Sequence, residues 1–127
     1  MSAANNVVGW FELYVSDMAR AKTFYQAVFQ REMFDLPSMG PDMQMCAFAW
    51  VEKGAGAAGA LVKSSKMAAG GGGTLVYFSC EDCSVEAARA QSSGGTLCQA
   101  KMGIGEYGFI AIVQDTEGNT IGLHSTK

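Results

Sequence analysis

Residues 10–29, WFELYVSDMARAKTFYQAVF, carry the pattern that decides the fold. The stretch from Trp10 to Val15 is aromatic or aliphatic apart from one glutamate, which is typical of a β-strand. Ser16 and Asp17 follow, and either side chain can cap the free backbone amides of a helix. Over residues 18–29, apolar side chains recur at spacings of three and four, which predicts an amphipathic helix. The segment therefore predicts a strand, a cap and a helix.

The second half of the chain repeats this order. Residues 75–80 predict a strand, residues 81–84 a turn into a helix, and residues 85–91 a helix that ends before two glycines. An offset of 65 residues aligns the halves, since it carries Val15 onto Cys80. In each half, an apolar strand, a turn and a final strand follow, at residues 45–51, 52–54 and 57–62, and again at 109–113, 116–119 and 120–124. We therefore predict an α+β fold of two tandem βαβββ modules.

Length and composition predict one domain over residues 1–127, because 127 residues with 49% apolar side chains suffice for one packed core. We assign residues 7–66 to the first module and residues 74–125 to the second. The intervening residues 67–73 form a predicted linker, because the four consecutive glycines at 70–73 favour a flexible connection.

Charge and hydropathy exclude several classes of partner. The net charge is −3, and the basic residues are scattered singly, so the chain lacks the positive face that nucleic-acid binding requires. The first residues lack the features of a secretory signal, and no apolar run approaches the roughly 18 residues of a membrane span. We expect a cytoplasmic protein with neither nucleic acid nor membrane as a partner.

The four cysteines are expected to be reduced thiols, because a chain rich in core residues needs no disulfide framework. We predict Cys46 and Cys98 to be small core residues. Cys80 and Cys83 are separated by two residues, the spacing of redox-active cysteine pairs. The acids at 81–82 between them, however, would raise the thiol pKa by like-charge repulsion. These two cysteines are therefore predicted to be plain residues where a strand passes into a helix.

Two further stretches have alternative interpretations. Residues 103–108, GIGEYG, match the dinucleotide motif G-x-G-x-x-G, but a strand and not a helix follows, so a glycine-rich loop at a pocket rim is predicted instead.

Methionines crowd the segment between the first helix and the next predicted strand, at Met33, Met39, Met43 and Met45. Flexible thioethers suit a ligand lid, a dimer contact or an irregular core edge.

The two modules, the Ser-Asp-Met-x-x-Ala-x-x-Phe-Tyr motif at 16–25 and the Asp-Thr-Glu-Gly-Asn turn at 115–119 together resemble the vicinal oxygen chelate superfamily. That superfamily includes glyoxalase I, the bleomycin-resistance proteins, fosfomycin-resistance enzymes and extradiol dioxygenases. The resemblance covers residues 7–125. It implies curved, partly open mixed sheets with helices outside, and a homodimer whose ligand sites lie between modules. It indicates the fold more specifically than the activity.

Enzymes of this superfamily usually hold a divalent metal with side chains from the first and last strand of each module. Carried over by position, the four places fall on Trp10, on Leu75 or Thr74, on Gly122, and on Gly59 or Ala60. None of these side chains is a ligand for such a cation. No cofactor is therefore predicted.

Glu12 and His124 each lie two residues beyond one of these places, where period-2 alternation keeps them on the same face. They could form a displaced site for one divalent metal ion, although two ligands are fewer than the three that a catalytic site usually supplies. Otherwise Glu12 is a polar group satisfied by a neighbour, and His124, the one histidine, is a strand-end residue.

Aromatic residues indicate a ligand pocket. Along the first strand, Trp10, Glu12 and Tyr14 share the concave face, while the alternate residues should meet the helix. Further residues are expected to join this face, which makes a predicted ligand-binding set of Trp10, Glu12, Tyr14, Phe48, Trp50, Tyr77 and His124. Such a lining suits a small apolar, flat or cationic organic molecule. Alternatively, these side chains simply fill the cavity.

Three hypotheses follow. The leading one is a non-catalytic small-molecule-binding protein that resembles the bleomycin-resistance branch. The alternative is a metal-dependent lyase, isomerase or dioxygenase in which Glu12 and His124 are the catalytic residues and Glu12 is a ligand or the proton-transfer base. A structural dimer with a filled cavity is the third.

Overall fold

The computed structural model describes residues 6–37, 40–70 and 72–127. Its contacts divide the chain into two compact units, which we term the amino-terminal unit (Trp10–Leu75) and the carboxy-terminal unit (Met1–Gly9 with Val76–Lys127). Met39 of the methionine-rich segment, Gly71 of the predicted linker and the first five residues, on which the expected lack of a signal rests, lie outside the described residues.

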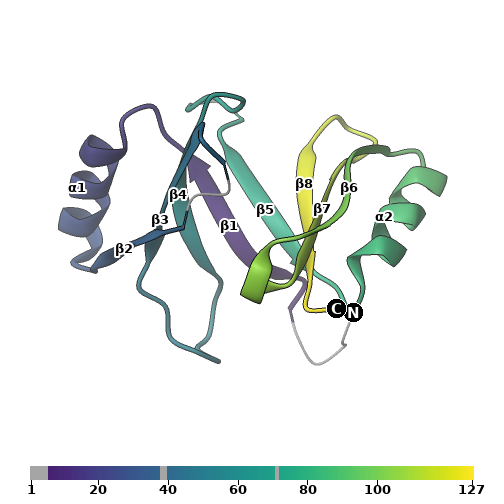
Figure 1. Cartoon of the computed structure of the whole chain (residues 1–127), viewed down its shortest axis with the longest axis horizontal. Helices are drawn as coiled ribbons and strands as arrows, with labels where there is room; N and C mark the ends of the chain where they lie inside the picture. Colours follow the sequence, from purple (N-terminus) through teal and green to yellow (C-terminus); the bar gives the residue numbers. More distant parts are fainter. Residues whose placement is uncertain (1–5, 38–39, 71) are drawn as a thin grey trace. The chain divides into compact units, whose positions relative to one another are not determined.

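The two predicted βαβββ modules are confirmed, and the strand directly after each helix, to which the sequence patterns assign no residues, is β2 in the first half and β6 in the second (Figure 1). The first half contains β1 (Val8–Tyr14), α1 (Met18–Phe29), β2 (Met33–Leu36), β3 (Met43–Phe48) and β4 (Ala58–Ser64). The second contains β5 (Thr74–Ser79), α2 (Cys83–Ser92), β6 (Thr96–Gly103), β7 (Phe109–Gln114) and β8 (Thr120–Ser125), with a short 3-10 turn, η1 (Gly105–Tyr107), before β7. The chain therefore contains two βαβββ modules.

Each module forms a mixed sheet in which the first and last strands are parallel neighbours. In the first module β1 pairs with β4, so that Glu12 lies opposite Ala60, and β3 pairs antiparallel with both β4 and β2. In the second module β5 pairs with β8, and β7 pairs antiparallel with both β8 and β6. Figure 1 shows one helix against one face of each sheet, α1 in the first module and α2 in the second.

A capping aspartate precedes α1 and α2. Asp17 Oδ1 accepts the backbone amide of Arg20 at 3.0 Å, and Asp82 Oδ1 accepts that of Ser84 at 3.0 Å. Of the two capping candidates in the first module, Asp17 is therefore the cap. These bonds satisfy amides that have no partner within the helix, so the side chain fixes where each helix starts.

The core of each unit lies between its helix and its sheet. In the amino-terminal unit, buried Met33, Cys46 and Leu61 pack with Leu13 and Tyr25. In the carboxy-terminal unit the buried residues are Cys83, Ala87, Ala111, Val113 and Leu123. Leu13 and Val15 pack against the same buried residues as Tyr25 of α1, so the predicted helix-facing side of the first strand is confirmed for these two residues.

Two predictions of burial are wrong. The spacing of three and four places Phe24, Val28 and Phe29 on the apolar side of α1, but they are 58%, 54% and 60% exposed. The α1 residues that pack against the buried core are Met18, Ala21 and Tyr25. Cys98 is exposed and not a core residue, because β6 carries register shifts against β7 and presents few buried positions. Cys46 is buried, as predicted.

The methionine-rich segment contains a strand. β2 begins at Met33, which is buried in the core, so this part of the segment is not a loop. Residues 103–108 connect β6 to β7 as a hairpin, and the strand predicted after them is confirmed. Among the described residues, no helix is long and apolar enough to cross a membrane.

Candidate functional site

Glu12 is a buried carboxyl held between two aromatic side chains of its own strand. Trp10 Nε1 donates to Glu12 Oε2 at 3.2 Å, and Tyr14 Oη donates to Glu12 Oε1 at 3.2 Å. The Glu12 side chain is 8% exposed. The three residues alternate along β1, so their shared face, as predicted from the sequence, is confirmed.

Burial controls the protonation of this group. Loss of solvent raises the pKa of Glu12 above its usual value, and the hydrogen bonds from Trp10 and Tyr14 lower it in part. The pKa of Tyr14 is also raised, first by burial and then by the adjacent Glu12. The Tyr14 hydroxyl therefore remains a donor. The carboxylate form of Glu12 is under-solvated, which suits it either to a cationic or donating ligand or to accepting a proton.

A second indole lies beside this carboxyl. Trp50 meets Trp10 edge to face, with ring centroids 6.2 Å apart and planes at 79°, and Trp50 is 45% exposed. On β4, the residues opposite Trp10 and Glu12 are Ala58 and Ala60. An exposed indole and a carboxyl above small side chains are features of a site for a flat organic molecule.

Phe48 does not share this face, and its predicted placement beside Trp10 is wrong. The register pairs Ala47 with Ala60, so Ala47 takes the Glu12 side of β3 and Phe48 the helix side. Phe48 contacts Phe11 and Tyr25, with ring centroids 6.0 and 5.7 Å away. The sequence predicted a strand to residue 51, but β3 ends at Phe48, so the alternation that grouped Phe48 with Trp50 does not continue.

Tyr77 and His124 belong to the carboxy-terminal unit. Tyr77 is buried and lies beside Gly122 in the parallel β5/β8 pair. His124 Nε2 lies 2.6 Å from the carbonyl oxygen of Tyr107. Because a carbonyl oxygen can accept but not donate, Nε2 carries the proton in this contact. The predicted grouping of Glu12 with Tyr77 and His124 stays a prediction.

Comparison with known proteins shows the family. The sequence profile of the Glyoxalase/Bleomycin resistance protein/Dioxygenase superfamily matches residues 7–123. The chain belongs to this superfamily. The resemblance inferred from the sequence motifs is thereby confirmed.

Solved structures support the same fold. A hypothetical protein from Bacillus halodurans C-125 has a TM-score of 0.72 at 8% identity and covers 94% of each chain. Methylmalonyl-CoA epimerase from Mycobacterium tuberculosis has a TM-score of 0.70 at 15% identity, covering 100% of this chain and 93% of that one. A Streptomyces coelicolor methylmalonyl-CoA epimerase variant in complex with 2-nitronate-propionyl-CoA has a TM-score of 0.70 at 15% identity, and the match covers 95% of this chain and 96% of that one. No curated protein matches significantly. At these identities the similarity shows the fold.

Trp10 and Gly122 stand at two of the places to which the resemblance carries the superfamily's usual metal ligands. Trp10 donates its indole N–H to Glu12. At Gly122, an added Cβ would lie 2.8 Å from Tyr77 Cγ, so the tyrosine ring occupies the space of a side chain there. Within the part of the chain that the structure describes, no group of three or more His, Cys, Asp or Glu side chains could hold a metal ion. These residues do not fit the superfamily's usual metal centre.

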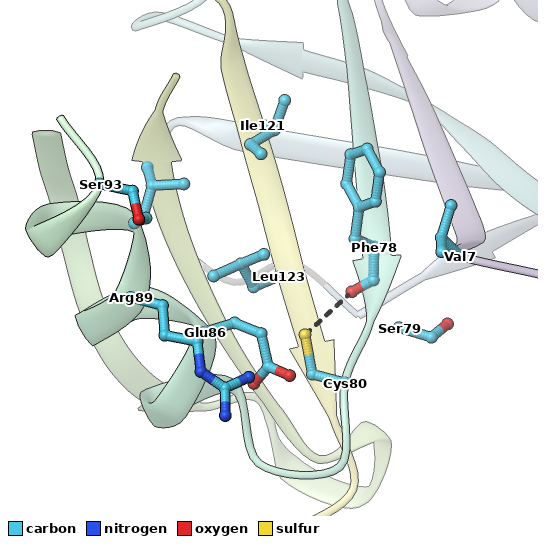
Figure 2. Close-up of a pocket in the computed structure, with 11 residues that line it drawn as sticks. Val7, Phe78, Ser79, Cys80, Glu86, Arg89, Ser93, Ile121 and Leu123 are labelled. Carbon is cyan, nitrogen blue, oxygen red and sulfur yellow. Dashed lines mark hydrogen bonds between the residues drawn. The ribbon is translucent and has the colours of Figure 1, made fainter. Parts of the chain in front are cut away.

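Cys80 lines a cavity of about 340 Å³ in the carboxy-terminal unit (Figure 2). Figure 2 shows Glu86 and Arg89 reaching it from α2, while Phe78 and Leu123 form an apolar wall. The Cys80 thiol donates to the carbonyl oxygen of Phe78, with an S···O distance of 3.7 Å. The cavity is therefore apolar on the sheet side and charged on the helix side.

The predicted rise in thiol pKa is confirmed for Cys80, but the cause differs from the prediction. Burial raises the pKa of Cys80 to about 11, and the next contribution comes from Glu86, one helical turn into α2, not from the two acids at 81–82. A thiol with so high a pKa is a poor nucleophile near neutral pH. The arrangement is therefore unsuited to redox chemistry at Cys80.

Sequence analysis missed several residues that line cavities. Glu86 and Arg89 are three apart and share a face of α2, a spacing that could have indicated them. A second cavity, also about 340 Å³, is lined by Phe11, Phe29 and Arg31 together with residues 48–51 and 54–59. The run of small residues at 54–59 follows the aromatic residues at the end of β3, and this combination in the sequence could have indicated the second cavity.

Proposed function

We propose that this superfamily member is a small-molecule-binding protein that holds a flat apolar or aromatic ligand at Glu12, Trp10 and Trp50 without catalysing a reaction. The observation that carries the proposal is the buried Glu12 carboxyl, held by two aromatic donors beside a half-exposed indole. A homodimer and a cytoplasmic location belong to the same proposal, on the resemblance alone.

Desolvation of the Glu12 carboxylate favours a ligand that carries a donor or a cation. A carboxylate removed from water is costly unless a donor or a cation reaches it. Two hydrogen bonds already reach Glu12, yet burial still raises its pKa, so a further donor or cation would stabilise the charged form. Indole faces attract flat rings and cations. The favoured ligand is therefore an aromatic molecule with a cationic or hydrogen-bond-donating group.

The residues at the superfamily's usual metal positions support a site without metal. Trp10 and Gly122 cannot coordinate a cation, and Tyr77 leaves no room for a longer side chain at position 122. His124 Nε2 donates to the Tyr107 carbonyl oxygen and cannot ligate while it does so.

A titration with two probes that share a ring tests the proposal. We expect naphthylmethylamine to bind more tightly than naphthylmethanol, because the amine supplies a cation to Glu12. Glu12→Gln should weaken amine binding about tenfold or more, as expected when a charged hydrogen bond worth about 1.5–3 kcal/mol is lost. Glu52→Gln, an exposed acid in the β3–β4 loop, is the matched control and should have no effect. Equal binding to wild type and Glu12→Gln would refute the proposed site.

The alternative function is a metal-dependent lyase, isomerase or dioxygenase with a displaced Glu12/His124 centre. The raised pKa of Glu12 favours it, because bases in proton transfer work best with a pKa near the working pH. Metal content per chain, measured on untagged protein, separates the two functions. About one equivalent of metal, reduced by Glu12→Gln, would support the enzyme and refute the binder. Less than about a tenth of an equivalent would refute the enzyme.

A further inference from the structure

A second pocket lies in the amino-terminal unit, on the helix-facing side of its sheet. Its volume is about 340 Å³, near the small end of ligand pockets in proteins. Walls come from β1, from the end of α1, from the end of β3 and from the loop that leads into β4. It is thus distinct from the Glu12 face, although Trp50 borders both.

The pocket has aromatic walls that contact one another. The rings of Phe11 and Phe48 are 6.0 Å apart, and Phe48 continues through Tyr25 to Phe29, at 5.7 and 6.2 Å. Phe29 and Trp50 remain 60% and 45% exposed. Exposed aromatic rings beside a preformed apolar cavity favour a ligand that is itself a flat ring, because it would remove these surfaces from water.

Arg31 supplies the charge at this pocket. Its Nη1 donates to the carbonyl oxygen of Ala49 at 3.5 Å, a long bond that leaves most of the five guanidinium N–H groups available. Within residues 6–37, 40–70 and 72–127, no carboxylate forms an ion pair with Arg31. A guanidinium of this kind matches a carboxylate in two parallel hydrogen bonds.

The opposite wall can adapt to a ligand. Residues 54–59, which span the end of the loop and the start of β4, are all glycines and alanines. Gly56 has a φ of +87°, a backbone conformation that residues with side chains rarely adopt. Nothing lies within 4 Å of the place where a Cβ of Gly56 would be. Open space for a ring therefore lies beside Gly56, whereas at Gly59 the Phe11 ring already packs against the backbone.

We propose that this pocket binds a small aromatic carboxylate, with its ring of one or two fused cycles against Phe11, Phe48 and Trp50 and its carboxylate on Arg31. The ligand class differs in charge from that of the Glu12 site, since one site offers a carboxyl and the other a guanidinium. Probes of opposite charge therefore distinguish the two sites, although both sites border Trp50.

Naphthoate is the probe, titrated into the full chain by calorimetry and by amide chemical-shift mapping. We expect saturable binding, with shifts at Phe29, Arg31 and residues 49–59. Arg31→Gln should weaken binding about tenfold, the effect of losing a charge-assisted pair. Lys53→Gln, which removes a cation from the same loop outside the pocket lining, should change affinity less than twofold.

Several outcomes would overturn the proposal. These are no saturable binding, equal affinity for Arg31→Gln and wild type, equal losses for Arg31→Gln and Lys53→Gln, or shifts confined to other residues. Failure of this site is distinguishable from failure of the proposed function, because Glu12→Gln should alter binding of naphthylmethylamine and leave that of naphthoate unchanged. Phe29→Ala at an exposed position provides a second variant that should fold, and it should weaken naphthoate about threefold or more.

Discussion

Replacing Gly122 by alanine should destabilise the protein through a clash with Tyr77. The added Cβ would lie 2.8 Å from Tyr77 Cγ, whereas ordinary contacts of this kind begin at 3.4 Å. Tyr77 Cδ1 and Cε1 would lie nearer still, so the ring must move by well over about 0.6 Å. Tyr77 is buried within β5, so it cannot rotate into solvent. Overpacking of this kind costs about 1–3 kcal/mol.

We expect about 2 kcal/mol of lost unfolding free energy, seen as a lower urea midpoint at an unchanged slope. Gly103→Ala is the matched control, because it also adds a Cβ next to an aromatic ring in a strand, but at 3.7 Å from Phe109. It should change stability by less than about 0.5 kcal/mol. Combining Gly122→Ala with Tyr77→Ala should show a coupling of about 1 kcal/mol or more. If Gly122→Ala is as stable as wild type, or if the double variant is additive, the steric argument is wrong.

Three further predictions concern titration. The pKa of Glu12 is raised in the folded state, so the contribution of Glu12 to stability is complete below its usual pKa of 4.5 and is lost as the pH rises through the folded pKa. Glu12→Gln should remove this decline in stability, as measured by urea unfolding at a series of pH values. The pKa of Asp82 is lowered to about 2, chiefly by the hydrogen bond from Lys101, so its contribution is present above 3.8 and lost between about pH 4 and 2; Asp82→Asn should flatten acid unfolding followed by circular dichroism. Iodoacetamide at pH 8 should alkylate exposed Cys98 at least about tenfold faster than Cys80, whose pKa is about 11. Comparable alkylation rates, measured by mass spectrometry of digested peptides, would contradict this prediction.

The sequence allowed the order of elements to be predicted where patterns were strong. Asp17 and the apolar periodicity that follows it predicted α1, and the face shared by Trp10, Glu12 and Tyr14 followed from simple alternation. Local rules suffice for these features because each depends on neighbours within a few residues.

Other features depend on register and tertiary packing. Phe48 was misplaced because strand alternation holds only while the strand lasts, and β3 ends there. The exposure of Phe24 depends on where α1 rests on its sheet. The causes that raise the pKa of Cys80 are burial first and then Glu86 of α2, and both depend on packing. β2 has four residues, too few for a periodic pattern to indicate it. None of these facts is encoded in local spacing alone.

The parallel pairing of β1 with β4 has a consequence for the order of folding. β2, β3 and β4 pair antiparallel with strands close by in sequence, whereas Glu12 must find Ala60, which lies beyond all of them. Closing so long a loop is slow compared with forming local hairpins. We expect the three-stranded meander to form first and β1 to add to its free edge afterwards. The Glu12 carboxyl would then be desolvated only in the last step, when β1 pairs with the edge of a sheet that has already formed.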